Sequence, residues 1–588
     1  MKLLRLKITD PKGFRSLQAG FEYKFRNERA LLEEHGFAPF VCAGPNGSGK
    51  SNLLEVLAAI FYHMECIYLE NKPDIFQYDD QDSPNGFRSE KAIPDGFEVE
   101  YVTPPKDSMT VKGIGEQAHV LIVKEPGKAP QWSLLNHEDM NGEVELIIDR
   151  TIARQLLPDF LLAYSSGENE ILSLPFFKMR FIQFDEYWQT LRRQDSYPSR
   201  PESRMAYLDN EFSQAILLCN LLFQDEDALA PYRTDVGIEE LTRFQIIIKR
   251  SVELSSNKLE GFIGKSLFNA PFGEGGFAQK HPAVSYDDLT NRYTINILRL
   301  LESDGALAVS ALKRCATCWF LDESTDTLYF DYVVNDATKG AFRENFSNDP
   351  LELFQTFRVL LTLNLYSVSD ALKSDLYQSD SYYVGETVPT LASDERIMRF
   401  KFVEFSKVNV VEPVLSKSLS DGEHQLLHTL GLCLLFKDKN CLFLLDEPET
   451  HFNPDWRANF ITRLHDCFAK AKGRCEMLIT THTPFLISDS KPDKVLVFEK
   501  DRDNGAVLVD NPQYNTLGAS INKITMETFG THKTIGGYAQ TELAELQKRF
   551  DQGEDKEQLY FELNQKLGDS VEKILLLKTI FDSTERTV

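Results

Sequence analysis

The octapeptide Gly44-Pro45-Asn46-Gly47-Ser48-Gly49-Lys50-Ser51 decides the fold of this 588-residue chain. It fits the pattern G-x-x-x-x-G-K-[ST], whose glycines let backbone amides curl around phosphate oxygens at the N-terminus of a helix. The apolar run 39–43 before it is typical of a buried strand. After it, four apolar residues fall on one helical face: Leu54, Leu57, Ala58 and Phe61. The octapeptide therefore predicts a strand, a phosphate-binding loop and a helix in this order.

Several side chains in and beside the octapeptide have expected roles. Lys50 is expected to reach the β- and γ-phosphates of a nucleotide, and Ser51 to hold Mg²⁺. The remaining residues expected to contact the nucleotide here are Asn46, Gly47, Gly49 and Asn52. The expected cofactors are therefore ATP and Mg²⁺.

The stretch CLFLLDEPETHFNP, residues 441–454, is a second motif that carries chemistry. An apolar strand that ends in acids delivers carboxylates to the carboxyl edge of a sheet, where doubly wound folds bind their ligands. Asp446 is expected to bind Mg²⁺, directly or through water, and Glu447 to orient or deprotonate the water that attacks the γ-phosphate. An acid pair after a strand can also simply cap the next element, so this interpretation depends on the other motifs.

Two further motifs complete the pattern. Leu419-Ser420-Asp421-Gly422-Glu423 precedes a leucine-rich helix, and Thr480-Thr481-His482 ends an apolar strand. Alone, the first could be an ordinary helix N-cap with an early acid, and His482 could be an ordinary core histidine. The four motifs in this order and at these spacings are not expected by chance.

This order of motifs resembles the ABC-type ATPases, in particular their SMC/RecF-like branch. The resemblance implies that residues 419–423 are the signature motif, with Ser420, Gly422 and Glu423 binding the nucleotide held by a second copy of the chain. Asp421 departs from the family, which often has glycine there. The resemblance also implies catalytic roles for Glu447 and for His482 as the switch histidine.

Two contacts near the nucleotide are less firmly defined by the sequence. Lys12-Gly13-Phe14-Arg15-Ser16 resembles the opening N-F-R-S motif of the family, which implies that Arg15 lies near the phosphates. The residue of the family's Q-loop is expected to be Gln183, in FIQFDEYW. The alternative is the polar turn 164–170, which follows an apolar strand.

The chain is expected to be an α/β protein, with an ABC-type P-loop ATPase head, a compact, mostly helical insertion and a helical C-terminal tail. The expected boundaries are 1–195 for the lobe with the phosphate loop, 196–394 for the insertion, 395–512 for the second ATPase lobe and 513–588 for the tail. Within these parts we predict a strand pair around TLYFDYVV, residues 327–334, and a hairpin that turns on Asn504-Gly505.

Bulk composition limits the setting and the partners. The net charge is −25 and the pI is near 5.0, which argues against a surface devoted to nucleic acid. Nucleic acid stays open as a partner, because net charge averages over all faces. No apolar run approaches the roughly 20 residues that a membrane span needs, and the nine scattered cysteines are typical of reduced core thiols. We therefore expect a cytoplasmic protein without a membrane partner.

The finer resemblance is to the ATPases of Septu anti-phage defence systems and to restriction-system-associated ATPases. It rests on EPETHFNP, on THTPFLIS, on the compact insertion and on the short helical tail. It implies a switch subunit that converts ATP and water to ADP and phosphate, forms at least a homodimer with higher oligomers open, and controls a separately encoded nuclease of the HNH type. The alternative is a RecF-like repair or recombination ATPase that clamps DNA.

Overall fold

The computed structural model describes the chain from residue 1 to 585 apart from several short stretches. The stretches outside the description are 28–29, 32–33, 35, 82, 105–116, 137–143, 146–148, 168, 198–199, 255, 264–280, 288–291, 303–306, 380–387, 389, 531–534 and 586–588.

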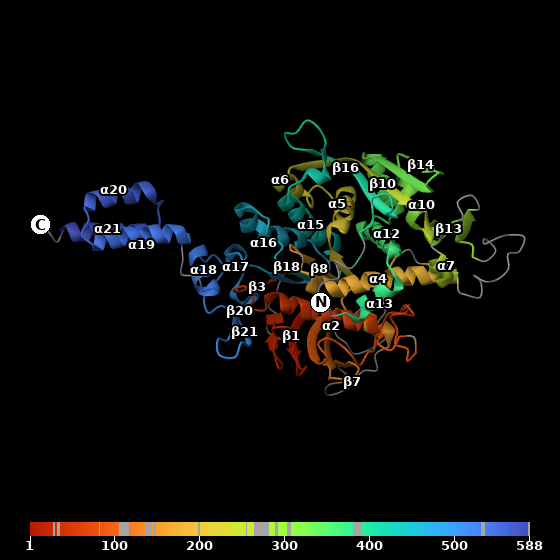
Figure 1. Cartoon of the computed structure of the whole chain (residues 1–588), viewed down its shortest axis with the longest axis horizontal. Coiled ribbons are helices and arrows are strands. Elements are labelled where there is room, and N and C mark those ends of the chain that lie inside the picture. Colours follow the sequence, from red (N-terminus) through yellow and green to blue (C-terminus); the bar gives the residue numbers. More distant parts are fainter. Residues whose placement is uncertain are drawn as a thin grey trace, which may run out of the picture.

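A seven-stranded sheet forms the centre of the molecule (Figure 1). In sheet order its strands are β21 (Val507–Asp510), β20 (Val495–Lys500), β3 (Phe40–Ala43), β19 (Glu476–Thr480), β18 (Cys441–Asp446), β8 (Phe160–Ser165) and β9 (Met205–Leu208). Neighbouring strands are parallel, except for the antiparallel hairpin of β20 and β21. That hairpin has Gly505 at positive φ, which confirms the predicted turn.

The middle strands β3, β18 and β19 are buried along their whole length, as parallel strands covered on both faces must be. Alternate residues therefore enter two different cores. On one face, Leu442 and Leu444 pack with α2 (Lys50–Ile67) and part of α4 (Glu170–Arg193). On the other face, Phe443 and Leu445 pack with α5 (Asn210–Phe223), α15 (Asp421–Phe436) and α16 (Pro454–Phe468).

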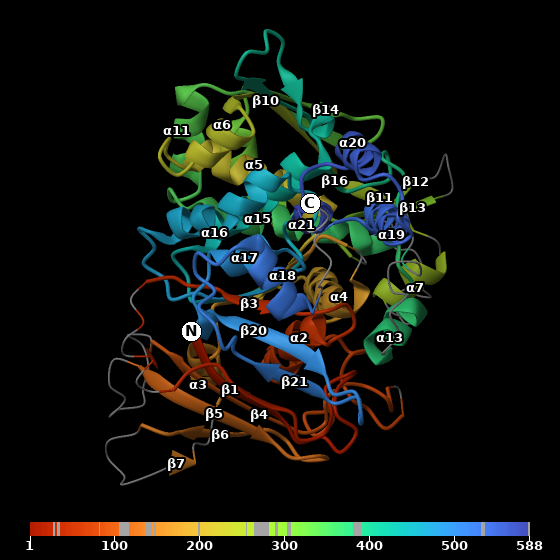
Figure 2. The same cartoon turned by 90° about the vertical axis from the view of Figure 1, so that its left-hand side faces the viewer.

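A six-stranded sheet packs on the side of α2 that faces away from the central sheet, so α2 lies in a layer between two sheets (Figure 2). In sheet order its strands are β2 (Glu22–Lys24), β1 (Lys2–Ile8), β4 (Phe97–Thr103), β5 (Ala118–Lys124), β6 (Gln131–Leu134) and β7 (Val144–Glu145). All pairs are antiparallel. The helix α3 (Arg150–Leu156) then leads into β8.

The segment 196–394 contains more helix than strand, and its strands form parts of three sheets. β9 is an edge strand of the central sheet. A five-stranded sheet has the order β14 (Cys318–Asp322), β15 (Thr327–Val333), β10 (Ile238–Lys249), β16 (Met398–Lys407) and β17 (Val414–Leu415), and a three-stranded sheet the order β11 (Ser251–Leu254), β13 (Arg292–Asn296) and β12 (Val284–Asp287). The pair β14 and β15 confirms the strand pair predicted around residues 327–334.

The helices of this segment pack mainly on the core that contains Phe443. Besides α5 they are α6 (Ala230–Asp235), α7 (Ser256–Ile263), α9 (Arg299–Glu302), α10 (Leu307–Cys315), α11 (Asp336–Asn345), α12 (Pro350–Thr362), the 3₁₀ helix η2 (Leu363–Ser367) and α13 (Asp370–Gln378). The short helices that follow in the second lobe are η3 (Ser416–Ser418), α17 (Pro484–Ser488) and η4 (Pro492–Lys494).

The C-terminal region is helical, as expected. α18 (Ile521–Phe529) packs on the main core, whereas α19 (Gly537–Asp551), α20 (Lys556–Lys566) and α21 (Val571–Glu585) project from the body (Figure 1). These three helices have a small core of their own, made by Leu546, Leu559, Leu563, Leu576 and Ile580. Across the described residues, no helix is both long and apolar enough to cross a membrane.

Candidate nucleotide-binding site

The octapeptide forms a loop between β3 and α2 in which three glycines have positive φ: 142° at Gly44, 74° at Gly47 and 102° at Gly49. A Cβ on Gly44 would lie 2.3 Å from the carbonyl oxygen of Phe498, so a larger residue does not fit there. The ammonium of Lys50 lies inside the loop and donates 3.0 Å hydrogen bonds to the carbonyls of Gly44 and Pro45. Burial lowers the pKa of Lys50. The loop thus holds a partly desolvated cation where a phosphate would bind.

Asp446, the last residue of β18, collects three donors from three different elements. The hydroxyl of Ser51 donates to Oδ1 over 2.8 Å, and the hydroxyl of Thr480 donates to the same oxygen over 2.6 Å. The amide of Asn169 donates to Oδ2 over 2.7 Å. The strands β8, β18 and β19 end at this edge, so the parallel sheet itself brings these side chains together.

Glu447 follows at the same edge, with its backbone held in a left-handed conformation at φ 50°. Its N–H donates to the side-chain hydroxyl of Thr480 over 3.0 Å and to the backbone carbonyl of the same residue over 3.2 Å. These bonds keep the side chain turned away from the buried strand and toward His482, whose Nε2 lies 2.6 Å from Oε1 of Glu447. The hydrogen bond from His482 lowers the pKa of Glu447, and the nearby charges of His482 and Lys50 lower it further. Glu447 is thus ionised and half-buried, as a general base must be.

The side chains present fit a magnesium nucleotide. Ser51 and Asp446 are hard oxygen donors already in contact, and Mg²⁺ prefers such ligands. The hydroxyl of Ser48 is buried in the loop and has no hydrogen-bond partner among the described residues, so an added phosphate oxygen would satisfy it. The tip of the loop at Asn46 and Gly47 is exposed and open to a ligand.

The signature segment begins α15 and is held as a preformed cap. Ser420 is the N-cap: its hydroxyl accepts from the N–H of Glu423 over 3.3 Å, while Glu423 accepts from the N–H of Ser420 over 2.8 Å. A Cβ on Gly422 would lie 2.7 Å from the carbonyl oxygen of His451, so α15 packs closely on the loop after Glu447. Ser420 is exposed, and within the described chain no hydrogen bond joins it to the phosphate loop.

The turn that contains Arg15 lies against the start of α2. The N–H and hydroxyl of Ser16 both donate to Oδ1 of Asn52, and a Cβ on Gly49 would lie 2.9 Å from the same hydroxyl. Arg15 itself has positive φ, 57°, and its guanidinium lies over the ring of Phe14 at 5.6 Å. The turn thus lies beside the start of α2, and the contact of Arg15 with the phosphates stays a prediction.

Gln183 does not lie at this edge of the sheet, and the prediction that it serves the Q-loop is corrected. It is buried in the middle of α4, roughly 20 Å along the helix from Asn169 at a rise of about 1.5 Å per residue. Asn169 caps α4 and bonds Asp446, and Ser166 bonds Thr450 over 2.9 Å. The alternative polar turn 164–170 is thus the segment that reaches the site, although its residue 168 lies outside the described residues.

Glu55 is a residue of this region that the sequence analysis missed. It is buried in α2, where the amide of Asn52 donates to it over 2.7 Å. Burial raises the pKa of Glu55 to about 6, and the charge of Asp446 acts in the same direction. An acid in the otherwise apolar run LLEVLAAI was the available signal.

The sheet order and the motifs gathered at its carboxyl edge resemble those of an ABC-type P-loop head of the SMC-like kind. A family model described as "AAA domain, putative AbiEii toxin, Type IV TA system" matches residues 333–488, roughly a quarter of the chain. The matched range contains the signature segment, β18 with Asp446 and Glu447, and His482.

Among curated proteins the chain resembles Septu protein PtuA of Bacillus thuringiensis. The two are 26% identical over 133 residues, which is 22% of this chain and 32% of PtuA. The alignment thus spans about a third of that relative.

Solved structures similar to the chain include SMC heads. One is an SMC head bound to the C-terminal winged-helix domain of ScpA, with a TM-score of 0.30, 10% identity and coverage of 87% of this chain and 98% of that one. Another, an SMC head with a coiled coil and joint from Pyrococcus yayanosii, has a TM-score of 0.29, 12% identity and coverage of 87% and 97%.

Proposed function

We propose that this chain is the ATP-binding and ATP-hydrolysing switch subunit of a bacterial anti-phage defence complex, and that it controls a separately encoded nuclease of the HNH type. The observation that carries the proposal is the cluster of Ser51, Asp446, Glu447 and His482 at one edge of the sheet. The resemblance to PtuA supports the defence role.

The chemistry assigned to these residues follows from their contacts. Lys50, Ser51 and Asp446 hold the phosphates and the metal, and Mg²⁺ when bound would offset phosphate charge. Glu447 accepts a proton from water at its Oε atoms, and His482 orients that carboxylate through the 2.6 Å contact. Arg15 and the residues Asn46, Gly47, Gly49 and Asn52 complete the proposed nucleotide contacts.

The site is completed by a second copy of the chain in this proposal. Ser420 and the N-terminus of α15 are exposed and capped in advance, which suits them to meet a phosphate presented by another protomer. Gly422 and Glu423 lie in the same turn. ATP then acts as a clamp between protomers, and hydrolysis releases it.

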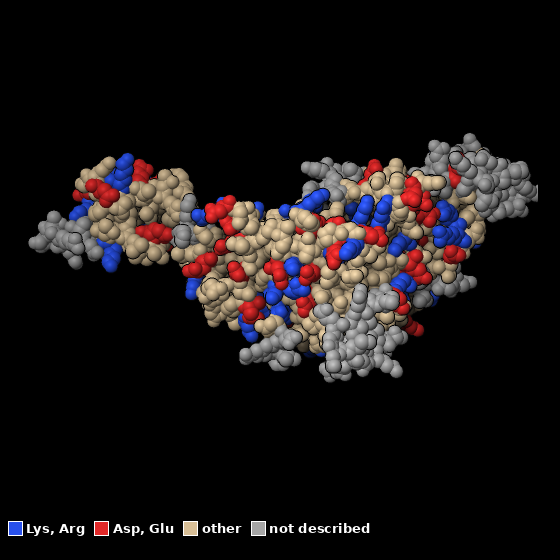
Figure 3. All heavy atoms as spheres, turned by 90° about the horizontal axis from the view of Figure 1, so that it is seen from below, with Lys and Arg blue, Asp and Glu red and all other residues tan. Residues whose placement is uncertain are grey.

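The remaining assignments are also proposals. The segments 1–195 and 395–512 act as the two ATPase lobes, 196–394 as the insertion and 513–588 as the tail. The nine cysteines form no disulfide, and eight of them are buried, which suits a cytoplasmic setting. Figure 3 shows acidic and basic side chains intermixed over the face it displays, so this face gives no support to DNA clamping.

The test combines activity with protection. Cells that carry the chain and the HNH protein encoded beside it are challenged with phage, and the same is done with Lys50→Ala, which removes the phosphate contact. Protection by the native pair alone, with ATPase activity in the purified native chain, supports the proposal. Equal protection with Lys50→Ala contradicts the switch role. Protection without any neighbouring nuclease contradicts the partner assignment.

A further inference from the structure

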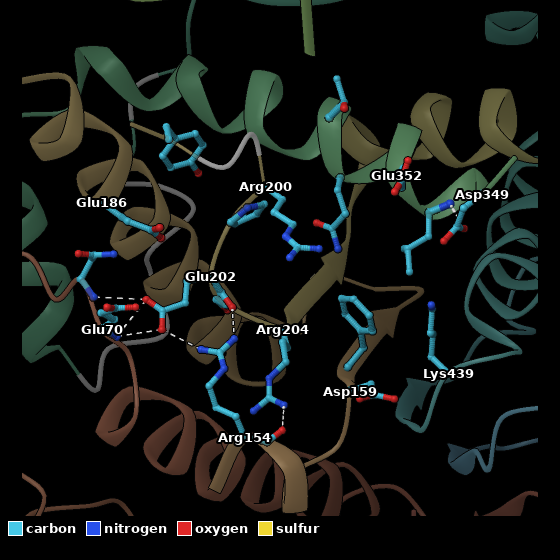
Figure 4. A pocket seen from close by; sticks show the side chains of 18 of the residues that line it. Glu70, Arg154, Asp159, Glu186, Arg200, Glu202, Arg204, Asp349, Glu352 and Lys439 are labelled. Carbon is cyan, nitrogen blue, oxygen red and sulfur yellow. Dashed lines mark hydrogen bonds and ion pairs between the residues drawn. The ribbon is translucent and has the colours of Figure 1, made fainter. Parts of the chain in front are cut away.

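A second cavity, of about 830 Å³, lies between the ATPase core and the segment 196–394 (Figure 4). Its wall includes the first residue of β8, Phe160, the residues just before β9, and Lys439 before β18. The phosphate loop lies at the opposite, carboxyl ends of the same strands. Strands of six residues separate the two by about 20 Å, at about 3.3 Å per residue. The cavity is thus distinct from the nucleotide site and has a volume typical of small-molecule sites.

Below one wall of the cavity lies a buried guanidinium that has no acidic partner. Arg358 is 2% exposed, and its nitrogens donate to the carbonyls of Ser203, over 3.1 Å, and of Met205. No carboxylate forms an ion pair with it in the part of the chain that the structure describes. Burial lowers the pKa of Arg358 to about 10, and the nearby charge of Arg180 contributes. A buried cation held only by carbonyls leaves positive potential toward the cavity.

Further arginines line the cavity itself. Arg154 bonds Glu202 over 2.8 Å, and Arg204 bonds Glu65 over 2.9 Å. Arg200 differs from these: it is exposed, and it makes neither a hydrogen bond nor an ion pair with any described residue. Figure 4 shows its side chain reaching into the cavity. The guanidinium of Arg200 therefore has unused hydrogen-bond donors, whereas Arg154 and Arg204 beside it are already bound to glutamates.

Most of the acidic groups around the cavity are already engaged. Glu202 accepts from two arginines and from backbone N–H groups, Asp349 caps α12 by accepting from the N–H of Leu351, and Asp159 accepts from the N–H of Asn440. Burial raises the pKa of Glu186 to about 8, so this carboxyl is mostly protonated near neutral pH. The side chains that line the cavity thus have more unused hydrogen-bond donors than unused acceptors.

The rest of the lining suits a ring. Phe160 and Phe346 supply apolar surface, and the buried Oε1 of Gln355 has no donor among the described residues, so it could accept a ligand N–H or O–H. Guanidinium forks match phosphate oxygens, and aromatic edges and an amide match a nucleobase.

We propose that this cavity binds the terminal phosphate of a nucleotide-sized ligand, with Arg200 as the main phosphate contact and the base toward Phe160 and Phe346. The phosphate monoester can belong to a free nucleotide or to the 5′ end of a nucleic-acid strand, since both present the same group. None of the residues that line this cavity takes part in the hydrolysis proposed at the phosphate loop.

The test uses UMP as the probe in calorimetric titrations of the Lys50→Ala chain, which lacks the phosphate-loop contact. We expect saturable binding of one equivalent, weakened about tenfold or more by Arg200→Glu, because a charge-assisted contact is replaced by repulsion. Arg502→Glu, at an exposed position in the turn between β20 and β21, is the matched control and should bind as before. Uridine without phosphate should not bind.

Two further arms distinguish the sources and keep the proposal open to contradiction. Hexathymidylate with a 5′-phosphate that binds more tightly than UMP assigns a strand end, and equal or weaker binding assigns a free nucleotide. No saturation by UMP up to about 10 mM, or UMP binding unchanged by Arg200→Glu, overturns the proposal. Measurable binding that is equally tight for the 5′-hydroxyl and 5′-phosphate strands also overturns it. If Lys50→Ala does not fold, the native chain is titrated after saturation with a non-hydrolysable ATP analogue.

Discussion

The hydroxyl of Ser51 donates a 2.8 Å hydrogen bond to Oδ1 of Asp446, although the two residues are 395 positions apart along the chain. The described chain between them includes the whole five-stranded and three-stranded sheets, and it returns so that one hydroxyl and one carboxylate meet. The contact brings together two hard oxygen donors of the kind that Mg²⁺ prefers, as the proposed magnesium site requires.

Glu447→Gln should leave ATP binding intact and lower turnover by a factor of about 10² to 10⁴, because the amide keeps the shape of the side chain but cannot accept the proton. ATP binding and phosphate release are measured on the purified chain, and we also expect a dimer trapped with ATP. Glu527→Gln, at an exposed position of α18, serves as the control. Near-normal turnover in Glu447→Gln would show that the base lies elsewhere.

The acidic limb of the pH profile should depend on His482. The hydrogen bond from His482 lowers the pKa of Glu447, and a general base works only when ionised. Activity is therefore lost as the pH falls through this lowered pKa. In His482→Ala the pKa of Glu447 rises toward its ordinary value, so the acidic limb of the remaining activity should move to higher pH. A limb that stays in place would argue against this coupling.

Mixing two inactive chains should restore activity. A Lys50→Ala chain lacks the phosphate contact, and a Ser420→Arg chain places a bulky cation where α15 would meet the partner's nucleotide. A heterodimer of the two has one intact composite site, so a mixture should regain a fraction of native hydrolysis. Each chain alone at doubled concentration is the control. If either single variant keeps full activity, or the mixture gains none, sites do not form between copies.

Removing the tail after residue 535 should spare nucleotide binding and weaken assembly or effector binding. The helices α19–α21 have their own small core, and α21 leaves Ile574 and Leu575 about 60% exposed. Such exposed apolar side chains on one short unit motivate the hypothesis that it docks a second subunit or the effector. Assembly is measured by light scattering, and effector binding by co-purification.

Two point variants separate the surface of this unit from its fold. Ile574→Ser changes an exposed residue, whereas Leu563→Ser breaks the small core, where Leu563 is fully buried. If the surface is the docking element, Ile574→Ser should impair assembly or effector binding without loss of helix content, whereas Leu563→Ser should impair them together with a loss of helix content measured by circular dichroism. An insoluble truncated chain would instead assign the tail to the ATPase core.

Local chemistry made part of the site predictable. Two motifs each combine a hydrophobic pattern with residue types suited to one local geometry: the octapeptide, and the strand that ends at Asp446 and Glu447. In the structure the two motifs meet, through Ser51 and Asp446. The prediction for Gln183 failed because the sequence pattern of a polar residue in an apolar helix is the same whether that residue faces a ligand or the core. The amide that reaches Asp446 is Asn169, and its helix-capping position could have been inferred from the turn chemistry of 164–170.

The fold was predictable where strands are central and less so elsewhere. β18 and β19 are continuous apolar runs, whereas β9 has only four residues and pairs with β8 alone, so nothing local distinguishes it from a loop. The long strand β10 was missed because its residues IEELTRFQIIIK mix alternation with an apolar run, and its register shifts against β16.

The helix α4 contacts the candidate nucleotide site at its N-terminal end and the second cavity near its C-terminal end. Its capping residue Asn169 bonds Asp446, and Glu186 and Thr190, four turns or more further along, line the second cavity. If a ligand bound at one end of α4 displaces the helix, it changes the free energy of ligand binding at the other end. Thermodynamic linkage makes that effect reciprocal: whatever factor UMP imposes on ATP affinity, ATP imposes on UMP affinity. Binding at the nucleotide site and binding at the arginine-lined cavity would then depend on the same conformational equilibrium.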